Sequence, residues 1–258
     1  MSLKLDNLSA RTGDRTLFEG LSAEIRPGQV WAVLGENGAG KSTLLRIMAG
    51  LGKAALGSVL LDERDVLRWP ARERARQIAW MAQHDDDGFS ATVMDCLVAA
   101  RYPYADLLSR DSGADEARAQ ALLGSVDLAG FADRTLWSLS GGERRRVALA
   151  AALMQATPYR LLDEPLAALD PRNQSTMIRL ISSTARADGA TVFTTHDPNH
   201  ALAIATHVLA IDGEATTHGP AQTMLDPRLL SALYRCEVSL VEQGAQRAFI
   251  VGQAHLVT

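Results

Sequence analysis

The first part of the chain alternates apolar and polar residues in short runs that predict β-strands. Residues 3–8 and residues 21–25 alternate in this way, and the turn-forming pairs Gly13-Asp14 and Pro27-Gly28 bound the runs. Two antiparallel strands are the expected result. The five residues that follow, Val30–Leu34, are all apolar, which predicts a buried strand.

Residues 93–154 follow a helical pattern instead. Alanine, leucine, arginine and aspartate recur there at helical spacing, and strand-forming runs are absent. The polar stretch 106–119 predicts a loop that leads into a helix. We therefore predict one domain over residues 1–258, in which a helical subdomain is inserted into an α/β core made of residues 1–92 and 155–225.

Strand-like runs return after this helical region. They lie at residues 161–162, 191–195 and 208–211, and a helix is expected at 177–186. Residues 226–258 form the expected C-terminal tail. It is predicted to contain a helix at 227–235 and a hairpin that pairs 238–241 with 248–251 and turns near Gln243-Gly244.

Composition and charge limit the functions that fit. Hydrophobic residues make up 47% and charged residues 22% of the 258 residues, which is typical of a folded globular protein. The formal net charge of −4 argues against broad attraction to nucleic acid or anionic lipid. No apolar stretch approaches the roughly 18 residues of a membrane span, and no secretory signal is expected. Cys96 and Cys236 stand alone, which excludes a disulfide framework or a cysteine-based zinc site.

Residues 35–42 carry the clearest chemistry. Their sequence, Gly-Glu-Asn-Gly-Ala-Gly-Lys-Ser, fits the phosphate-binding P-loop and stands between a predicted strand and a predicted helix. Glycines let backbone N–H groups surround phosphate oxygens, and the helix N-terminus adds partial positive charge. Lys41 is expected to reach the β- and γ-phosphates, and the Ser42 hydroxyl to ligate Mg²⁺. The candidate phosphate-binding residues are Gly35, Asn37, Gly38, Ala39, Gly40, Lys41, Ser42 and Thr43.

Two further elements strengthen this interpretation. Asp163 and Glu164 end a predicted strand, where Asp163 can hold Mg²⁺ and Glu164 can polarise a hydrolytic water. Alone this pair is weak evidence, because strand ends often carry solvated acids. Ser140, Gly141 and Gly142 form a turn ahead of a helical run and make a second anion-binding helix N-terminus. It must serve a different phosphate or a different subunit.

With these three elements, the sequence resembles an ATP-binding cassette (ABC) ATPase over nearly its whole length. The resemblance implies a P-loop NTPase core of the ABC type with an N-terminal antiparallel β-subdomain and an inserted α-helical subdomain. It also implies a head-to-tail homodimer. ATP bound at residues 35–42 of one subunit is then closed by Ser140, Gly141 and Gly142 of the other.

The resemblance assigns roles to further residues. Gln83 corresponds to a glutamine that contacts Mg²⁺ and the attacking water and senses the transmembrane partner. Asp170 corresponds to the anchor of a loop that crosses the dimer, and His196 to the histidine that touches the γ-phosphate. The implied catalytic residues are Lys41, Gln83, Glu164 and His196, and the implied Mg²⁺ ligands are Ser42, Gln83 and Asp163.

Three positions depart from the family's pattern. No aromatic residue is present where many cassettes stack one on adenine; Arg11 can either substitute with its planar guanidinium or be a solvated surface charge. Tyr159-Arg160 interrupts the apolar run before Asp163. Arg145 stands where glutamine is common, and we interpret it as part of a solvated helix face.

Histidine and cysteine residues do not predict a metal centre. His196 and His200 are four residues apart, but they follow a strand and lack an acidic third ligand. We interpret residues 84–87, His-Asp-Asp-Asp, as a solvated acidic loop. Cys96 is expected to pack as a small hydrophobe.

The resemblance favours a transport function. Residues 89–93, residues 99–103 and the tail around Leu233-Tyr234 are similar to cassettes that serve iron–siderophore, haem and cobalamin uptake. The expected partners are two separate permease subunits and, indirectly, a periplasmic binding protein, at the cytoplasmic face of the bacterial inner membrane. No nucleic-acid partner is expected. Among these substrates, a ferric siderophore is the one that we favour. The alternative functions are the ATPase of another importer or exporter, a non-transport cassette, or a nucleotide-binding regulator that hardly hydrolyses ATP.

Overall fold

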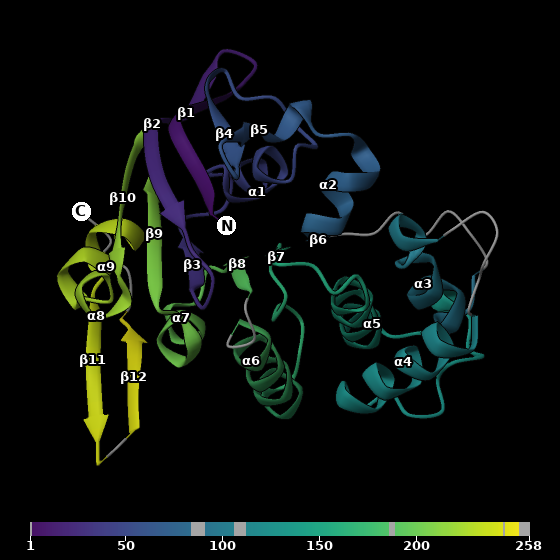
Figure 1. Ribbon diagram of the computed structural model, residues 1–258. Coiled ribbons are helices and arrows are strands. Elements are labelled where there is room, and N and C mark those ends of the chain that lie inside the picture. The colour runs from purple at the N-terminus through teal and green to yellow at the C-terminus, as the bar shows by residue number, and fades with distance from the viewer. Residues whose placement is uncertain (1, 84–90, 106–111, 186–188, 245, 253–258) are drawn as a thin grey trace.

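A six-stranded sheet forms the centre of the computed structural model, which describes residues 2–83, 91–105, 112–185, 189–244 and 246–252 (Figure 1). The strand order is β10-β9-β3-β8-β7-β6, and neighbours are parallel except that β10 runs antiparallel to β9. The strands are β3 (Val30–Leu34), β6 (Ile78–Met81), β7 (Tyr159–Leu162), β8 (Ala190–Thr194), β9 (His207–Asp212) and β10 (Ala215–Pro220).

A four-stranded antiparallel sheet lies above this central sheet (Figure 1). Its order is β2-β1-β4-β5, with β1 (Leu3–Thr12), β2 (Arg15–Ile25), β4 (Leu56–Leu61) and β5 (Arg64–Asp65). Helix α1 (Lys41–Met48) lies between the two sheets, and its Leu44 and Leu45 share a core with Leu5 of β1 and Val33 of β3. The expected N-terminal antiparallel subdomain is confirmed.

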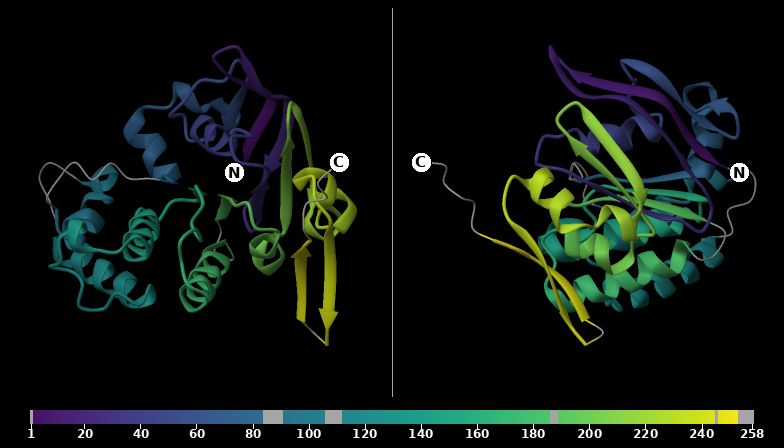
Figure 2. Two further views of the ribbon diagram at one scale, coloured as in Figure 1. Left: turned by 180° about the vertical axis from the view of Figure 1, so that it is seen from behind. Right: turned by 90° about the vertical axis from the view of Figure 1, so that its left-hand side faces the viewer.

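Helices α5, α6 and α7 pack in the core on the other face of the sheet. The described residues of 93–154 form helices, as their sequence pattern predicts, and α3, α4 and α5 group next to β6 and β7 (Figures 1 and 2). None of the described helices combines the length and the apolarity that crossing a membrane requires. The helices are η1 (Val66–Arg68), α2 (Ala71–Gln77), α3 (Val93–Ala99), η2 (Tyr102–Tyr104), α4 (Ser112–Ser125), η3 (Leu136–Ser138), α5 (Gly141–Met154), α6 (Pro171–Ala185), α7 (Pro198–Ile204), α8 (Ala221–Met224) and α9 (Pro227–Tyr234).

The central sheet is covered on both faces, which explains its continuous apolar strands. In β3, Ala32 and Leu34 face the core shared with α5, α6 and α7, whereas Trp31 and Val33 face the core shared with α1. Successive side chains of a strand point to opposite faces, so a strand with two covered faces has no polar alternation.

The last strands of the described residues form a two-stranded hairpin of β11 (Val238–Gln243) and β12 (Gln246–Val251), which extends away from the two sheets (Figure 2). The hairpin expected from the sequence is therefore present. Asn199 of α7 fixes it: its side-chain amide donates to the Phe249 carbonyl at 3.1 Å and accepts from the Phe249 N–H at 2.8 Å. The Phe249 side chain is buried in the same core as α7 and α9.

Strand β8 carries two threonines with 0% exposure, Thr191 and Thr194, and only one of them is used by its neighbours. The Thr194 hydroxyl donates to Asp163 Oδ1 at 2.6 Å and accepts from the Glu164 N–H at 2.8 Å. Thr191 Oγ1 has no hydrogen-bond partner among the described residues. Thr194 therefore ties the end of β7 to β8, whereas Thr191 only fills space.

Replacing these two threonines by valine should have opposite effects. Thr194→Val leaves the partly buried Glu164 N–H without its acceptor, so we expect a loss of about 1–3 kcal/mol in the free energy of unfolding. Thr191→Val removes a buried hydroxyl without a partner, so it should be neutral or stabilising. Urea denaturation of the two variants measures both; equal losses would show that the Thr194 hydrogen bonds do not stabilise the fold.

Candidate active site

Many of the predicted site residues gather where the parallel strands end, although Arg11 and Ser140–Gly142 lie elsewhere. The backbone ladder continues past the strands, because Asp163 N–H donates to Met81 O at 2.9 Å and Thr195 N–H donates to Val33 O at 3.1 Å. The loops after β3, β6, β7 and β8 therefore leave the sheet at the same edge. This edge is the usual place for ligands in open α/β sheets.

The loop after β3 is shaped by glycines that cannot be replaced without displacement. A Cβ on Gly35 would lie 2.7 Å from the Ile211 carbonyl oxygen of β9. Gly40 has a left-handed backbone, and a Cβ there would lie 3.0 Å from Leu17 Cβ. Gly40 also provides no side-chain cap for α1, so the first N–H groups of the helix remain available to an anion.

Lys41 lies inside this loop. Its side chain is 6% exposed, and Nζ donates to the carbonyl oxygens of Gly35 at 2.7 Å and Glu36 at 2.9 Å. Burial lowers the pKa of Lys41, and the negative charges of Glu164 and Asp163 oppose that shift. Of the other loop residues, Asn37 and Gly38 are exposed, Ala39 is buried, and Ser42 and Thr43 are partly exposed.

Asp163 and Glu164 have different environments at the end of β7. Asp163 is buried and held by Thr194. Glu164 has a left-handed backbone with φ of 48°, a strained conformation for a residue with a side chain. Its Oε1 lies 3.5 Å from Nδ1 of His196, whose side chain is 59% exposed. Glu164 and His196 therefore face each other at the open side of the site.

Three other predicted residues lie on the surface. Gln83 follows β6 and is exposed. Asp170 precedes α6 and accepts from the backbone and side chain of Asn173 at 2.8 and 2.7 Å; the backbone bond is the main reason that its pKa is lowered. Arg11 is exposed, and its backbone pairs with Thr16 across the β1–β2 hairpin. Thr16 precedes Leu17, which packs against Gly40.

Ser140, Gly141 and Gly142 are at the N-terminus of α5. Ser140 forms a capping box with Glu143: Ser140 N–H donates to Glu143 Oε2 at 2.7 Å, and Glu143 N–H donates to Ser140 Oγ at 3.3 Å. The bond from Ser140 lowers the pKa of Glu143. Helix α5 lies with α3 and α4 in what we call the helical group, whereas α1 lies beneath the antiparallel sheet (Figure 1). The two helix N-termini predicted to bind anions thus stand apart in one protomer.

Two sequence interpretations are wrong. Arg145 is not part of a solvated face: it is 9% exposed, and its guanidinium donates to backbone carbonyls of the loops after β6 and β7. Tyr159 and Arg160 do not interrupt the strand before Asp163 but belong to β7. Tyr159 is 1% exposed, and burial raises its pKa to about 12. In both cases packing from another element covers a side chain that looks polar in the sequence.

The described residues contain no group of three metal-ligating side chains. His200 is buried and hydrogen-bonds Thr195 Oγ1 at 2.9 Å, and burial lowers its pKa. The acidic stretch 84–87 lies outside the described residues. Cys96 is partly buried against the core, as expected.

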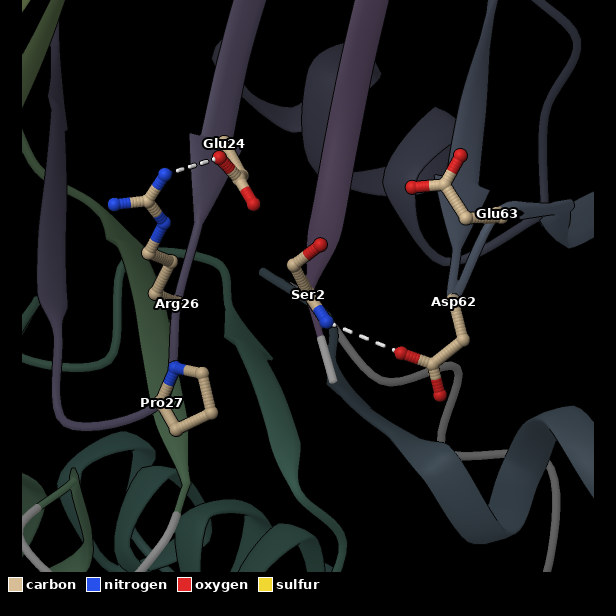
Figure 3. Close-up of a pocket in the computed structure, with 6 residues that line it drawn as sticks. All are labelled: Ser2, Glu24, Arg26, Pro27, Asp62 and Glu63. Atoms are coloured by element: carbon tan, nitrogen blue, oxygen red, sulfur yellow. Dashed lines mark hydrogen bonds and ion pairs between the residues drawn. The ribbon is translucent and has the colours of Figure 1, made fainter.

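A separate surface pocket lies at the edge of the antiparallel sheet and is poorly suited to phosphate (Figure 3). Carboxylates dominate its lining. The Arg26 guanidinium is paired with Glu24 at 2.6 Å, and the Ser2 N–H donates to Asp62 at 3.1 Å. The pocket is lined by Ser2, Glu24, Arg26, Pro27, Asp62 and Glu63.

Known relatives resemble the chain over almost its whole length. A hemin import ATP-binding protein of Rhodococcus jostii is 38% identical over 252 residues, covering 97% of this chain and 86% of that protein. One from Pseudomonas aeruginosa is 38% identical over 251 residues, covering 95% and 96%. A ferric enterobactin transport ATP-binding protein of Escherichia coli is 33% identical over 240 residues, covering 92% and 89%.

Solved structures share the fold. One described as an inward-facing conformation of a metal-chelate type ABC transporter matches with a TM-score of 0.84 and 27% identity over 99% of each chain. A dimeric ATP-binding cassette in a post-hydrolysis state, bound to ADP and phosphate, matches with a TM-score of 0.76 and 25% identity, covering 85% of this chain and 98% of that one. The ABC transporter family itself matches residues 18–167. The chain belongs to the ABC transporter family.

Proposed function

We propose that this chain is the ATP-hydrolysing subunit of an importer for a metal chelate, and that it acts through separate permease subunits. The observation that carries the proposal is the near full-length similarity to import ATP-binding proteins. The grouping of Lys41, Asp163 and Glu164 at one sheet edge supports ATP hydrolysis as the energy source.

Residues 35–43 bind the ATP phosphates in this proposal. The uncapped N-terminus of α1 offers backbone N–H groups, and Lys41 exchanges its two carbonyl contacts for phosphate oxygens. Ser42, Asp163 and Gln83 supply the oxygen ligands that Mg²⁺ prefers. Asp163 suits this role because Thr194 fixes its orientation. When bound there, Mg²⁺ would supply neutralisation of the charge on the transferring phosphoryl group.

Glu164 orients the attacking water, and His196 contacts the γ-phosphate. Their separation of 3.5 Å and the exposure of His196 support a reacting phosphoryl group next to both side chains. Phosphoryl transfer depends on positioning and charge stabilisation rather than on a covalent intermediate. A fixed carboxylate beside the open side of the loop fits that requirement.

Each ATP site is completed by a second copy of the chain. Ser140, Gly141 and Gly142 of one protomer close the ATP held by residues 35–43 of the other, and Asp170 anchors the loop between the two. The separation of α5 from α1 within one protomer supports this head-to-tail arrangement (Figure 1). The dimeric structure bound to ADP and phosphate is a second support.

The substrate class comes from the relatives. Those named above are ATP-binding proteins of hemin import and of ferric enterobactin transport, so haem is the first substrate to test and a ferric siderophore the second. Cobalamin is the third member of the proposed class. The complex contains two permease subunits, receives substrate from a periplasmic binding protein, and holds this chain at the cytoplasmic face of the inner membrane.

Glu164→Gln tests the hydrolytic role. The amide keeps the size of the side chain but does not accept a proton, so turnover should fall by about 10²–10⁴-fold while ATP binding persists. Phosphate release and binding of a fluorescent ATP analogue measure the two effects. Glu242→Gln, on the exposed hairpin, is the matched control and should hydrolyse ATP normally. Near-normal turnover of Glu164→Gln would remove Glu164 from the catalytic role.

Arg11→Ala tests whether Arg11 replaces an adenine-stacking aromatic. Stacking on a base is worth about 1–3 kcal/mol, so ATP affinity should fall roughly tenfold. Arg15→Ala changes an exposed arginine of the same hairpin and serves as the control. Titration with a fluorescent ATP analogue gives both affinities. Unchanged affinity in Arg11→Ala would identify Arg11 as a solvated surface charge.

Co-purification tests the transport role. A tagged chain should bring down an integral membrane permease, and the complex in lipid vesicles should take up haem when ATP is present on the side of the chain. Lys41→Ala should assemble with the permease but take up nothing, because its phosphate contact is lost. Uptake of a ferric siderophore alone would change the substrate, whereas recovery of ribosomes or DNA would contradict transport.

A further inference from the structure

Arg145 connects helix α5 to the two loops that carry Gln83 and Glu164. Its guanidinium donates to four carbonyl oxygens: those of Ala82 and Gln83 at 2.8 Å each, that of Glu164 at 3.0 Å from Nε, and that of Asp163. Both loops follow strands of the central sheet, whereas Arg145 belongs to the helical group. One side chain thus joins three separate segments.

The next residue provides an internal comparison. Arg146, like Arg145, is 9% exposed. Its guanidinium donates to two carbonyl oxygens, those of Val126 at 2.9 Å and Asp127 at 3.1 Å. Both of these acceptors lie in the chain between α4 and α5. Arg146 therefore holds the helical group together, whereas Arg145 holds it to the sheet.

Arginine suits this position because its planar guanidinium presents five N–H donors in a fixed fork. The ammonium of a lysine is a compact point charge, and a glutamine amide has only two donors. Neither side chain offers as many donors in a fixed fork.

Arg145 also holds the backbone of Glu164, which is left-handed and strained. The Glu164 N–H donates to Thr194 of β8, and its carbonyl accepts from Arg145 and from the Ala167 N–H. The N–H of Glu164 is thus held by the sheet, and its carbonyl by α5. A shift of α5 is therefore expected to displace the backbone of Glu164.

We propose that Arg145 is a positioning residue that couples the two ATP sites of the dimer. This inference rests on the proposed function. The N-terminus of α5 closes the ATP held by the second copy, whereas Gln83 and Glu164 serve the ATP of their own protomer. When the far ATP draws Ser140, Gly141 and Gly142 into place, α5 carries Arg145 with it. Arg145 then sets the carbonyls of Gln83 and Glu164 for hydrolysis at the near site.

The test compares Arg145→Gln and Arg145→Lys with Arg146→Gln in the full-length chain. Hydrolysis is measured against ATP concentration, and binding with a fluorescent ATP analogue. The wild type should show a Hill coefficient above 1, up to about 2 for two coupled sites. In both Arg145 variants it should fall to about 1. Their kcat should fall by about ten- to a hundredfold, because a displacement of about 1 Å in a catalytic group can cost about 10²-fold. ATP binding to the single protomer should change less than about twofold, since the carbonyls of Ala82, Gln83, Asp163 and Glu164 that accept from Arg145 lie outside residues 35–43.

Arg146→Gln shows whether an effect comes from lost coupling between the ATP sites or only from the loss of a buried guanidinium. It loses a guanidinium of the same burial, so its thermal stability should fall, but its Hill coefficient should stay at the wild-type value. Amide hydrogen exchange should rise near residues 82–83 and 163–167 in the Arg145 variants, and near 126–127 in Arg146→Gln.

The possible results lead to different conclusions. A wild-type chain that neither binds nor hydrolyses ATP would overturn the proposed function itself. A cooperative wild type with an unchanged Hill coefficient in folded Arg145→Gln would overturn the coupling role alone. A wild-type Hill coefficient of 1, or an equal fall in Arg146→Gln, would overturn it as well.

Discussion

The parallel pairing of β6, β7, β8 and β3 determines where Lys41, Gln83, Asp163, Glu164 and His196 can lie. Because the ladder continues through Asp163 and Thr195, the loops after these strands begin side by side. Thr194 then fixes the Asp163 side chain relative to this backbone, since its hydroxyl hydrogen-bonds both Asp163 Oδ1 and the Glu164 N–H. The site thus depends on strand register first and on individual side chains second.

The elements with strong local signals could be predicted from the sequence. Residues 35–42 need glycines, a lysine and a following helix, and all of these are local requirements. The buried strand Val30–Leu34 is predicted by its continuous apolar run, and the C-terminal hairpin by two strand-like runs around Gln243-Gly244. Strand β10 does not, because it is an exposed edge strand with the polar sequence Ala-Thr-Thr-His-Gly-Pro. The short run Ile-Ala-Trp-Met of β6 is apolar enough to signal a buried strand.

The contacts between distant segments could not be predicted in the same way. Arg145 stands in a run of three arginines on a helix, and nothing in that run tells which one reaches the loops after β6 and β7. Thr194 is similar: a threonine within an apolar strand signals a buried hydroxyl, but not its partners. Only the placement of α5 and β7 beside these side chains decides their roles.

The attachment of the last strand affects how the chain can be altered. Asn199 holds both backbone groups of Phe249, and α7, which carries Asn199, begins two residues after His196. A truncated version that stops before β12 would leave the Asn199 amide without its partners and open the core around α9 to water. Fusion tags and immobilisation linkers are therefore better joined in a way that leaves residues 246–252 intact.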